Sequence, residues 1–315
     1  MLSRETLVNA LLDLRRATVR GHRAPYKPLT LLWALGRIWR DSKVDRLIEF
    51  QEARAGVVPL FEQFGRGGNH PVNPVNPLWR LQGDGDGSIW ECRTRGPVIC
   101  GADGIPTSSD LTRTSAHFGF ALPTYELLVA DIPLRLQAGQ VLASQVCPLE
   151  IWPELFEATG IPFDGTASNF LIPVSTSRTR EIAGRVARSP QFRVGVLEAY
   201  GHRCAVCSTS PQIGERRFGV EAAHIQWVTE EGPDEVQNGL ALCVMHHRGF
   251  DRGAFTLTDA LDIHVSPRLQ RPNVDAPDHF WHFDRRPISR PLQSNYQPRR
   301  DFIEWHRREV FATGD

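Results

Sequence analysis

The sequence predicts an α+β fold built from two domains. Its 315 residues exceed the usual size of one domain, and a composition that is 41% hydrophobic and 23% charged is that of a globular chain able to bury two cores. Apolar residues recur at helical spacing in the first half, whereas cysteine and histidine pairs cluster between residues 200 and 256. We therefore expect a first domain over residues 1–165, a linker over 166–190 and a second domain over 191–315.

The first domain is expected to be mainly helical. Residues 3–18 predict an amphipathic helix, because apolar residues such as Leu7 and Leu11 recur every three or four positions. A second helix begins near Pro28, since proline suits the first turn, where the missing N–H has no partner to lose. A third helix is expected over residues 47–64.

A small β-hairpin is the expected exception to this helical pattern. Residues 65–77 are rich in Gly, Asn and Pro and predict a loop. The following sequence predicts a hairpin, in which one strand holds Trp79 and Leu81 and the other covers residues 89–92 after a Gly-Asp turn. Residues 124–146 predict a further helix.

Two stretches beyond the first domain complete the expected elements. Residues 255–265 alternate like a pair of strands. Residues 285–308 hold seven Arg against Asp301 and Glu304, which fits a surface helix, a DNA-backbone contact or a dimer surface equally well.

Charge gives only a local indication of partners. The formal net charge is zero, so any attraction to nucleic acid must come from local patches. Between Arg4 and Lys43 there are nine Lys or Arg against three Asp or Glu, which indicates either a solvated face or a surface that faces phosphates.

Targeting and cysteine usage predict a cytoplasmic protein without a membrane partner. The first residues do not follow a signal-peptide pattern, and no run approaches the ~20 apolar residues of a membrane-spanning helix. Three of the six cysteines (Cys92, Cys100 and Cys147) are isolated, which fits a reducing compartment.

The clearest motif is a set of paired soft ligands. Cys204 and Cys207 form a C-x-x-C pair, and Cys243 and His246 form a C-x-x-H pair. Each pair is short enough to hold one metal ion, and three Cys with one His suit tetrahedral Zn²⁺. Four ligands complete a structural zinc site.

Further polar residues lie between and after these pairs, within three short sequence words: EAAHI over 221–225, NGLALC over 238–243 and HHRGFDRG over 246–253. These words resemble those of the HNH nucleases, the ββα-metal superfamily, and the resemblance covers about the last third of the chain. It implies an enzyme that hydrolyses phosphodiesters. Such hydrolysis needs a base to deprotonate water and a cation to neutralise the leaving oxygen.

The same resemblance assigns roles to individual residues. His224 would be the general base at the end of the first hairpin strand, Asn238 would orient it, and His247 would bind a catalytic Mg²⁺ or Mn²⁺. Asp251 lies one helical turn beyond His247 at i+4 and is expected to be a second ligand. Ala223 stands where many relatives carry a metal-binding Asp or His.

Two words of the first domain, RAPYKPLTLLWALGRI and NPLWRLQGDG, resemble the sulfur-binding domain of bacterial type IV, modification-dependent restriction endonucleases of the McrA type. Those enzymes recognise phosphorothioate DNA and join this domain to a C-terminal HNH domain, which is the order found here. The family often has an aromatic residue before the proline of the second word, where this sequence has Asn76.

The resemblance implies a shallow apolar pocket surrounded by basic residues. Sulfur is larger, more polarizable and less strongly hydrated than oxygen, so an apolar wall penalises oxygen more. Neighbouring cations would hold the remaining negative charge. Each candidate also has an ordinary structural explanation, such as a loop proline or a surface charge. The candidates for DNA binding are Arg23, Tyr26, Lys27, His70, Pro71, Pro77, Arg80 and Arg113.

The sequence therefore predicts a modification-dependent endonuclease that reads phosphorothioate in double-stranded DNA and cuts nearby. Its zinc would be structural and its Mg²⁺ or Mn²⁺ catalytic. We expect a homodimer, because cutting two strands usually takes two active sites. Two alternatives stay open: an HNH enzyme that reads methylated bases or plain sequence, and a non-catalytic zinc module that binds nucleic acid or protein.

Overall fold

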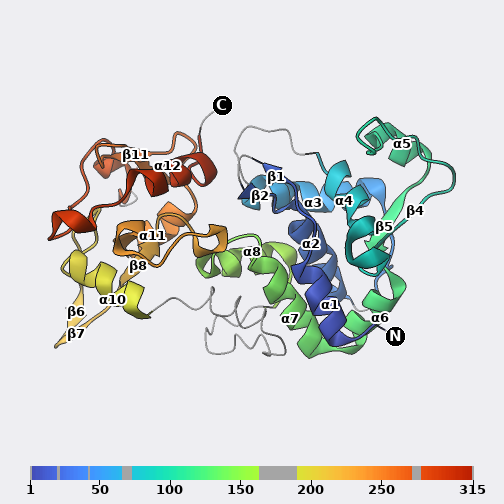
Figure 1. Ribbon diagram of the computed structural model, residues 1–315, viewed down its shortest axis with the longest axis horizontal. Coiled ribbons are helices and arrows are strands. Elements are labelled where there is room, and N and C mark those ends of the chain that lie inside the picture. The colour runs from blue at the N-terminus through green and yellow to red at the C-terminus, as the bar shows by residue number, and fades with distance from the viewer. Residues whose placement is uncertain are drawn as a thin grey trace. The chain divides into compact units, whose positions relative to one another are not determined.

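The computed structural model describes residues 2–19, 22–41, 43–65, 73–162, 190–271 and 278–313. Among these, the residues up to 162 form one compact unit and those from 190 onward form another (Figure 1). The expected linker over 166–190 lies almost entirely outside the described residues. No helix of the described residues is long and apolar enough to cross a bilayer.

The first unit is organised around a central buried helix, α2 (Tyr26–Arg40). Its residues from Pro28 to Gly36 are all buried. It contacts α3 (Phe50–Phe64), α4 (Val75–Arg80), α7 (Ile132–Ala143) and α8 (Trp152–Thr159). A Cβ at Gly36 would lie 1.7 Å from the Thr159 carbonyl oxygen, so only glycine allows α8 to approach this closely. The longer helices of this unit are α1 (Arg4–Leu12), α2, α3 (Phe50–Phe64), α6 (Leu122–Ala130), α7 (Ile132–Ala143) and α8 (Trp152–Thr159).

Two of the expected helices differ in extent. The first ends at Leu12 rather than at residue 18, and a short strand, β1 (Thr18–Val19), follows and pairs with β2 (His22–Arg23). The helix expected over 124–146 is two helices, because Asp131 caps the second one: its carboxylate accepts from the backbone N–H of Leu134 at 3.0 Å.

The hairpin expected around the Gly-Asp turn is wrong. Residues 75–80 form a helix, α4 (Val75–Arg80), and a 3-10 helix follows over Leu81–Gly87. Val75, Leu78 and Leu81 recur every three residues and are all buried, which is a helical rather than an alternating pattern. The side-chain oxygen of Asn73 accepts the N–H of Val75, the first residue of the helix, at 3.0 Å.

The sheet of this unit instead pairs strands that are far apart in sequence. Its antiparallel order is β3 (Ile48–Glu49), β5 (His117–Phe120) and β4 (Trp90–Arg93), with Trp90 opposite Phe120. A short helix, α5 (Ser108–Arg113), precedes β5 and is capped by Thr107.

The second unit is built on an antiparallel hairpin of β8 (Val220–His224) and β9 (Gly239–Cys243), followed directly by α11 (Val244–Asp251). This is the strand–strand–helix order that the HNH resemblance implied. Both α10 (Pro190–Ala199) and α11 contact the hairpin. A Cβ at Gly239 would lie 2.3 Å from Val196, so glycine lets α10 pack against the hairpin.

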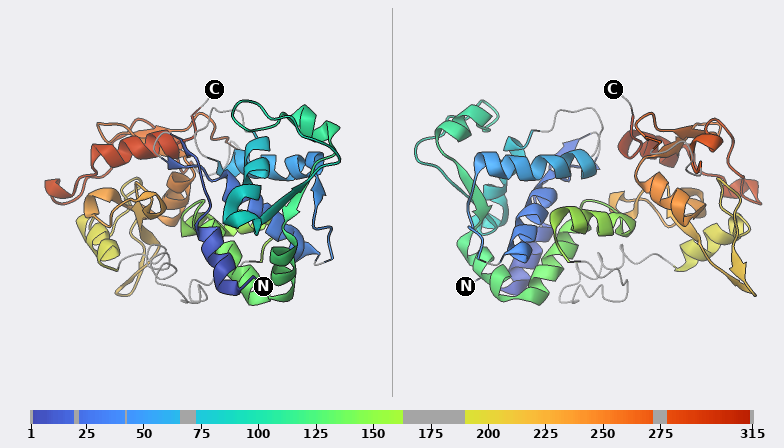
Figure 2. Two further views of the ribbon diagram at one scale, coloured as in Figure 1. Left: turned by 45° about the vertical axis from the view of Figure 1, so that its right-hand side comes forward. Right: turned by 180° about the vertical axis from the view of Figure 1, so that it is seen from behind.

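Several further elements complete this unit (Figure 2). The expected strand pair is confirmed as β10 (Phe255–Leu257) and β11 (Ile263–Val265). The Arg-rich tail forms a helix, α12 (Arg300–Glu309), whose Phe302, Ile303 and Trp305 are buried. A small hairpin, β6 (Gln212–Ile213) and β7 (Arg216–Arg217), extends the cysteine-bearing loop.

Candidate metal centre and nuclease site

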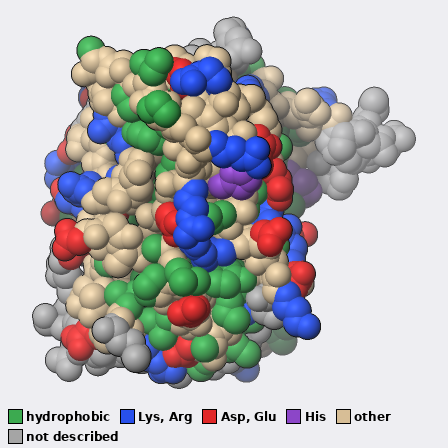
Figure 3. Space-filling model, turned by 90° about the vertical axis from the view of Figure 1, so that its right-hand side faces the viewer, with side chains coloured by type: hydrophobic (Ala, Val, Ile, Leu, Met, Phe, Trp, Pro, Cys, Tyr) green, Lys and Arg blue, Asp and Glu red, His purple; other side chains and the backbone are tan. Residues whose placement is uncertain are grey.

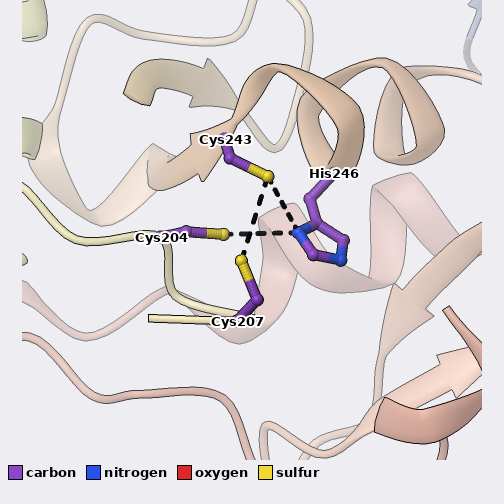
Figure 4. A group of neighbouring side chains, drawn as sticks. All are labelled: Cys204, Cys207, Cys243 and His246. Carbon is purple, nitrogen blue, oxygen red and sulfur yellow. Dashed lines mark hydrogen bonds between the residues drawn. The ribbon is translucent and has the colours of Figure 1, made fainter. Parts of the chain in front are cut away.

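The three cysteines and the histidine of the paired motifs meet at one point. Cys204 and Cys207 lie in the loop after α10, Cys243 ends β9 and His246 lies in the first turn of α11. Figure 4 shows the three sulfur atoms and one ring nitrogen facing one another, and the four atoms lie within 4.8 Å of each other. The Nδ1 atom of His246 is 3.1 Å from the Cys243 sulfur and 3.5 Å from that of Cys204.

The surroundings of His246 prepare it to act as a ligand. Its Nε2–H donates to the carbonyl of His279 at 2.7 Å, which leaves the Nδ1 lone pair directed at the sulfurs. Burial of the ring would lower the pKa of His246, but hydrogen bonds with Cys207 and Cys243 outweigh it and raise the pKa to about 10. An imidazole must be neutral to bind a metal ion, so zinc binding at Nδ1 would compete with protonation of this ring.

The predicted general base, His224, lies at the end of the β8–β9 hairpin that is away from the candidate metal ligand Cys243. His224 is the last residue of β8, and its side chain is 8% exposed. Its Nε2 lies 2.8 Å from a carboxylate oxygen of Asp234. Its ring stacks on Phe192 of α10, with centroids 3.7 Å apart and planes 11° apart. The imidazole is thus held on one face by an aromatic ring and at one nitrogen by a carboxylate.

Asn238, expected to orient the base, instead makes three hydrogen bonds with the backbone of the loop between the strands. Its side chain is fully buried. Its Oδ1 accepts the N–H of Gln226 at 2.9 Å, and its Nδ2 donates to the carbonyls of Gln226 and Pro233 at 3.0 Å each. Since Asp234 follows Pro233, this hydrogen bond ties Asn238 to the loop that carries Asp234.

His247 lies between two carboxylates. Its Nδ1 is 2.7 Å from Glu221 of β8, and its Nε2 is 3.3 Å from Asp251, which ends α11. The expectation that Asp251 faces the same side as His247 is met by this contact. Sequence reasoning did not select Glu221, although strand alternation places it on the same face as Ala223, where relatives carry their metal ligand.

The two imidazoles contact different carboxylates among the described residues. His224 contacts Asp234 and Phe192, whereas His247 contacts Glu221 and Asp251. Alternation along β8 agrees with this, because residues 221 and 224 project from opposite faces of a regular strand. Within the part of the chain that the structure describes, the Cys₃His group is the one cluster of three or more His, Cys, Asp or Glu side chains placed to hold a metal ion.

Among the DNA-binding candidates, Lys27 has a structural partner. Its ammonium group pairs with Asp84, whose side chain is 1% exposed and whose other oxygen accepts the backbone N–H of Arg15 at 2.8 Å. The ring of Tyr26 contacts Phe61 edge-on at 5.0 Å, and burial raises the pKa of its hydroxyl. Asp84 was not selected from the sequence, because a Gly-Asp repeat normally indicates a solvated turn.

The three arginine candidates are exposed and lie on different elements. Arg23 ends β2, Arg80 donates to the carbonyl of Asp103 at 2.8 Å, and Arg113 pairs with Asp110 at 3.1 Å. Figure 3 shows one face of the molecule, on which Lys and Arg side chains alternate with Asp and Glu rather than forming one patch.

The proline and histidine candidates divide between the described residues and the rest. Pro77 is buried within α4. His70 and Pro71 lie outside the described residues.

Comparison with known sequences and structures places this arrangement in a family. Residues 4–164, just over half of the chain, match the family described as ScoMcrA-like, DNA sulfur-binding domain, and residues 204–258 match the HNH endonuclease family. A comparison with curated proteins gave no match.

Solved structures with similar segments include the sulfur-binding domains of ScoMcrA and SprMcrA, each complexed with phosphorothioated DNA. Each is 23% identical, with TM-scores of 0.41 and 0.42, and the match covers 49% and 50% of this chain and 94% of each domain. The type IV phosphorothioation-dependent restriction endonuclease ScoMcrA also matches at 23% identity and a TM-score of 0.41, over 49% of this chain and 32% of that one. On its sequence match, this chain belongs to the family of ScoMcrA-like DNA sulfur-binding domain proteins, and it joins that domain to a C-terminal HNH endonuclease domain.

Proposed function

We propose that this protein is a modification-dependent DNA endonuclease. Its first domain binds double-stranded DNA that carries a phosphorothioate, and its HNH domain hydrolyses a phosphodiester near the modified site. The observation that carries the proposal is the presence, in one chain, of a sulfur-binding domain match and an HNH endonuclease match. Joining the two confines cutting to DNA on which the first domain is bound.

The Cys₃His group would hold Zn²⁺ in a structural role. Four soft ligands leave no open position for substrate, and such closed sites stabilise small folds directly. Its ligands come from the loop after α10, from the end of β9 and from α11, so one ion would hold the hairpin and the helix together.

The catalytic Mg²⁺ or Mn²⁺ would be held by His247 and Asp251, which meet at the Nε2 atom of the ring. Asp251 supplies the carboxylate oxygen that such hard cations favour. Glu221 contacts the other ring nitrogen, Nδ1, and would therefore orient the imidazole rather than join it on the ion. When bound, such an ion neutralises charge that develops on the phosphate oxygens. The ring of His224 takes the proton of the attacking water, and Asn238 holds the loop beside it.

In the first domain, Arg23, Arg80 and Arg113 are the candidates for phosphate contact, because their side chains are exposed. Tyr26 and Pro77 would contribute apolar wall to the sulfur pocket. Lys27 would act mainly by neutralising Asp84, which holds the 3-10 helix after α4 in place. We further propose a cytoplasmic homodimer, which would present two HNH domains to the two strands.

The test uses matched duplexes that differ by one sulfur atom. The protein is expected to bind and cut the phosphorothioate duplex in the presence of Mn²⁺ or Mg²⁺ and to leave the unmodified duplex intact. His224→Ala should abolish cutting and leave binding unchanged. Equal binding to both duplexes would remove the sulfur-reading role, and a fully active His224→Ala variant would remove the assigned active site.

A further inference from the structure

We infer that Asp234 is a positioning residue for the general base and fixes which nitrogen of His224 is basic. The inference rests on the proposed function and adds a residue to its active site. Its starting point is the 2.8 Å contact between His224 Nε2 and the Asp234 carboxylate. An ionised carboxylate has no hydrogen to donate, so Nε2 carries the hydrogen and Nδ1 keeps its lone pair.

The loop that carries Asp234 is fixed by its own hydrogen bonds. Asn238 binds the carbonyl of Pro233, the residue before Asp234, and both backbone groups of Gln226. The N–H of Asn238 also donates to the carbonyl of Glu235 at 2.8 Å. The residues on either side of Asp234 are thus tied to the buried Asn238, which limits the positions available to the carboxylate.

Two further neighbours of the ring are apolar. Phe192 of α10 stacks flat on the imidazole, and Gly239 is its cross-strand partner. Stacking restricts the tilt of the ring but exerts no preference between the two nitrogens. The Asp234 carboxylate does exert such a preference, because it accepts from Nε2–H, and it also stabilises the imidazolium once Nδ1 has taken a proton from water. Because the Asp234 side chain is 42% exposed, we expect orientation to contribute more than charge.

The experiment compares Asp234→Asn and Asp234→Ala with wild type in the full-length protein. Asn keeps an oxygen that can accept from Nε2–H, whereas Ala removes both the charge and the acceptor. Glu231→Gln is the matched control, because it removes an exposed carboxylate from the same loop. Cutting of the phosphorothioate duplex is measured in single turnover with enzyme in excess, across pH, alongside DNA affinity and thermal unfolding.

We expect the rate to fall roughly 10²-fold in Asp234→Ala and by less in Asp234→Asn, because only part of the general-base contribution is lost. The acid limb of the rate profile should move to lower pH in both, since the carboxylate no longer favours the imidazolium. Glu231→Gln should keep the wild-type rate and profile. Wild-type rate and pH profile in Asp234→Ala would overturn the inference while leaving the nuclease function intact.

A second readout does not depend on cutting. Nitrogen-15 NMR of ring-labelled histidine, assigned by loss of a signal in His224→Ala, reports which nitrogen carries the hydrogen. Wild type should show the Nε2–H form of His224, and Asp234→Ala should show a mixture of both forms. An Nδ1–H form in wild type would overturn the inference. If no DNA is cut by wild type, the proposed function fails while this measurement still decides the role of Asp234.

Discussion

Replacing Asn238 by Ala should loosen the loop between the hairpin strands and reduce cutting indirectly. The side chain is fully buried and makes three hydrogen bonds, to the N–H and carbonyl of Gln226 and to the carbonyl of Pro233. Leaving a buried polar group without its partner costs about 1–3 kcal/mol. Water can reach this loop, so we take the lower end of that range, about 1 kcal/mol, for each of the three backbone groups. The expected loss for the second unit is therefore about 3 kcal/mol.

Unfolding of the second unit in urea is monitored through the release of zinc. Fluorescence of the whole chain would combine the unfolding transitions of both domains. Hydrogen exchange of residues 225–238 measures the loop itself. Gln237→Ala is the matched control: its side chain donates one exposed hydrogen bond to the Asn295 carbonyl, so we expect a loss below about 1 kcal/mol.

Asn238→Asp separates the individual bonds. It keeps an oxygen for the N–H of Gln226 but places a second oxygen against the carbonyls of Gln226 and Pro233, so it should be at least as unstable as Asn238→Ala. If Asn238→Ala unfolds and exchanges like wild type, the loop is not held by this residue and its role in orienting His224 must be direct.

Three further outcomes are expected. Burial lowers the pKa of His306 to about 3 from an ordinary 6.5, so between these two pH values the unfolded chain binds a proton that the folded chain does not. The free energy of unfolding is therefore unaffected by His306 above pH 6.5 and falls by about 1.4 kcal/mol per pH unit as the pH drops toward 3. Urea midpoints of the second unit across pH should show a flatter acid slope in His306→Gln, and an unchanged slope would contradict this. Lys27→Met should destabilise the first unit by about 3 kcal/mol by leaving the Asp84 carboxylate buried without its ammonium partner, and a wild-type urea midpoint would show that Lys27 is free to serve DNA instead. Purified protein should hold one zinc per chain by elemental analysis, and Cys207→Ser should lower zinc content and the unfolding temperature together; equal zinc content in the variant would exclude Cys207 as a ligand.

What could be predicted from the sequence was local in origin. The spacing of Cys204 to Cys207 and of Cys243 to His246 brings each pair together within a single turn, so the metal cluster required only that the two turns meet. Helical periodicity likewise located the buried face of α1, on which Leu7 and Leu11 lie one turn apart. The order of strand, strand and helix in the second unit came from the resemblance to the HNH nucleases rather than from periodicity.

The tertiary structure decided which distant side chains became partners. Asp234 meets His224 because a buried Asn238 closes the loop between them, and Lys27 meets Asp84 because α2 packs beside the segment that follows α4. Around Trp79 the Gly-Asp turn predicted a hairpin, whereas the structure has a helix followed by a 3-10 helix. The buried residues there recur every three positions, and packing them against the core decided in favour of the helices. Hydrophobic periodicity predicts which apolar residues share a buried face, but it says nothing about the partner of a carboxylate. The partners of Asp84 and Asp234 therefore depend on how the chain folds back on itself.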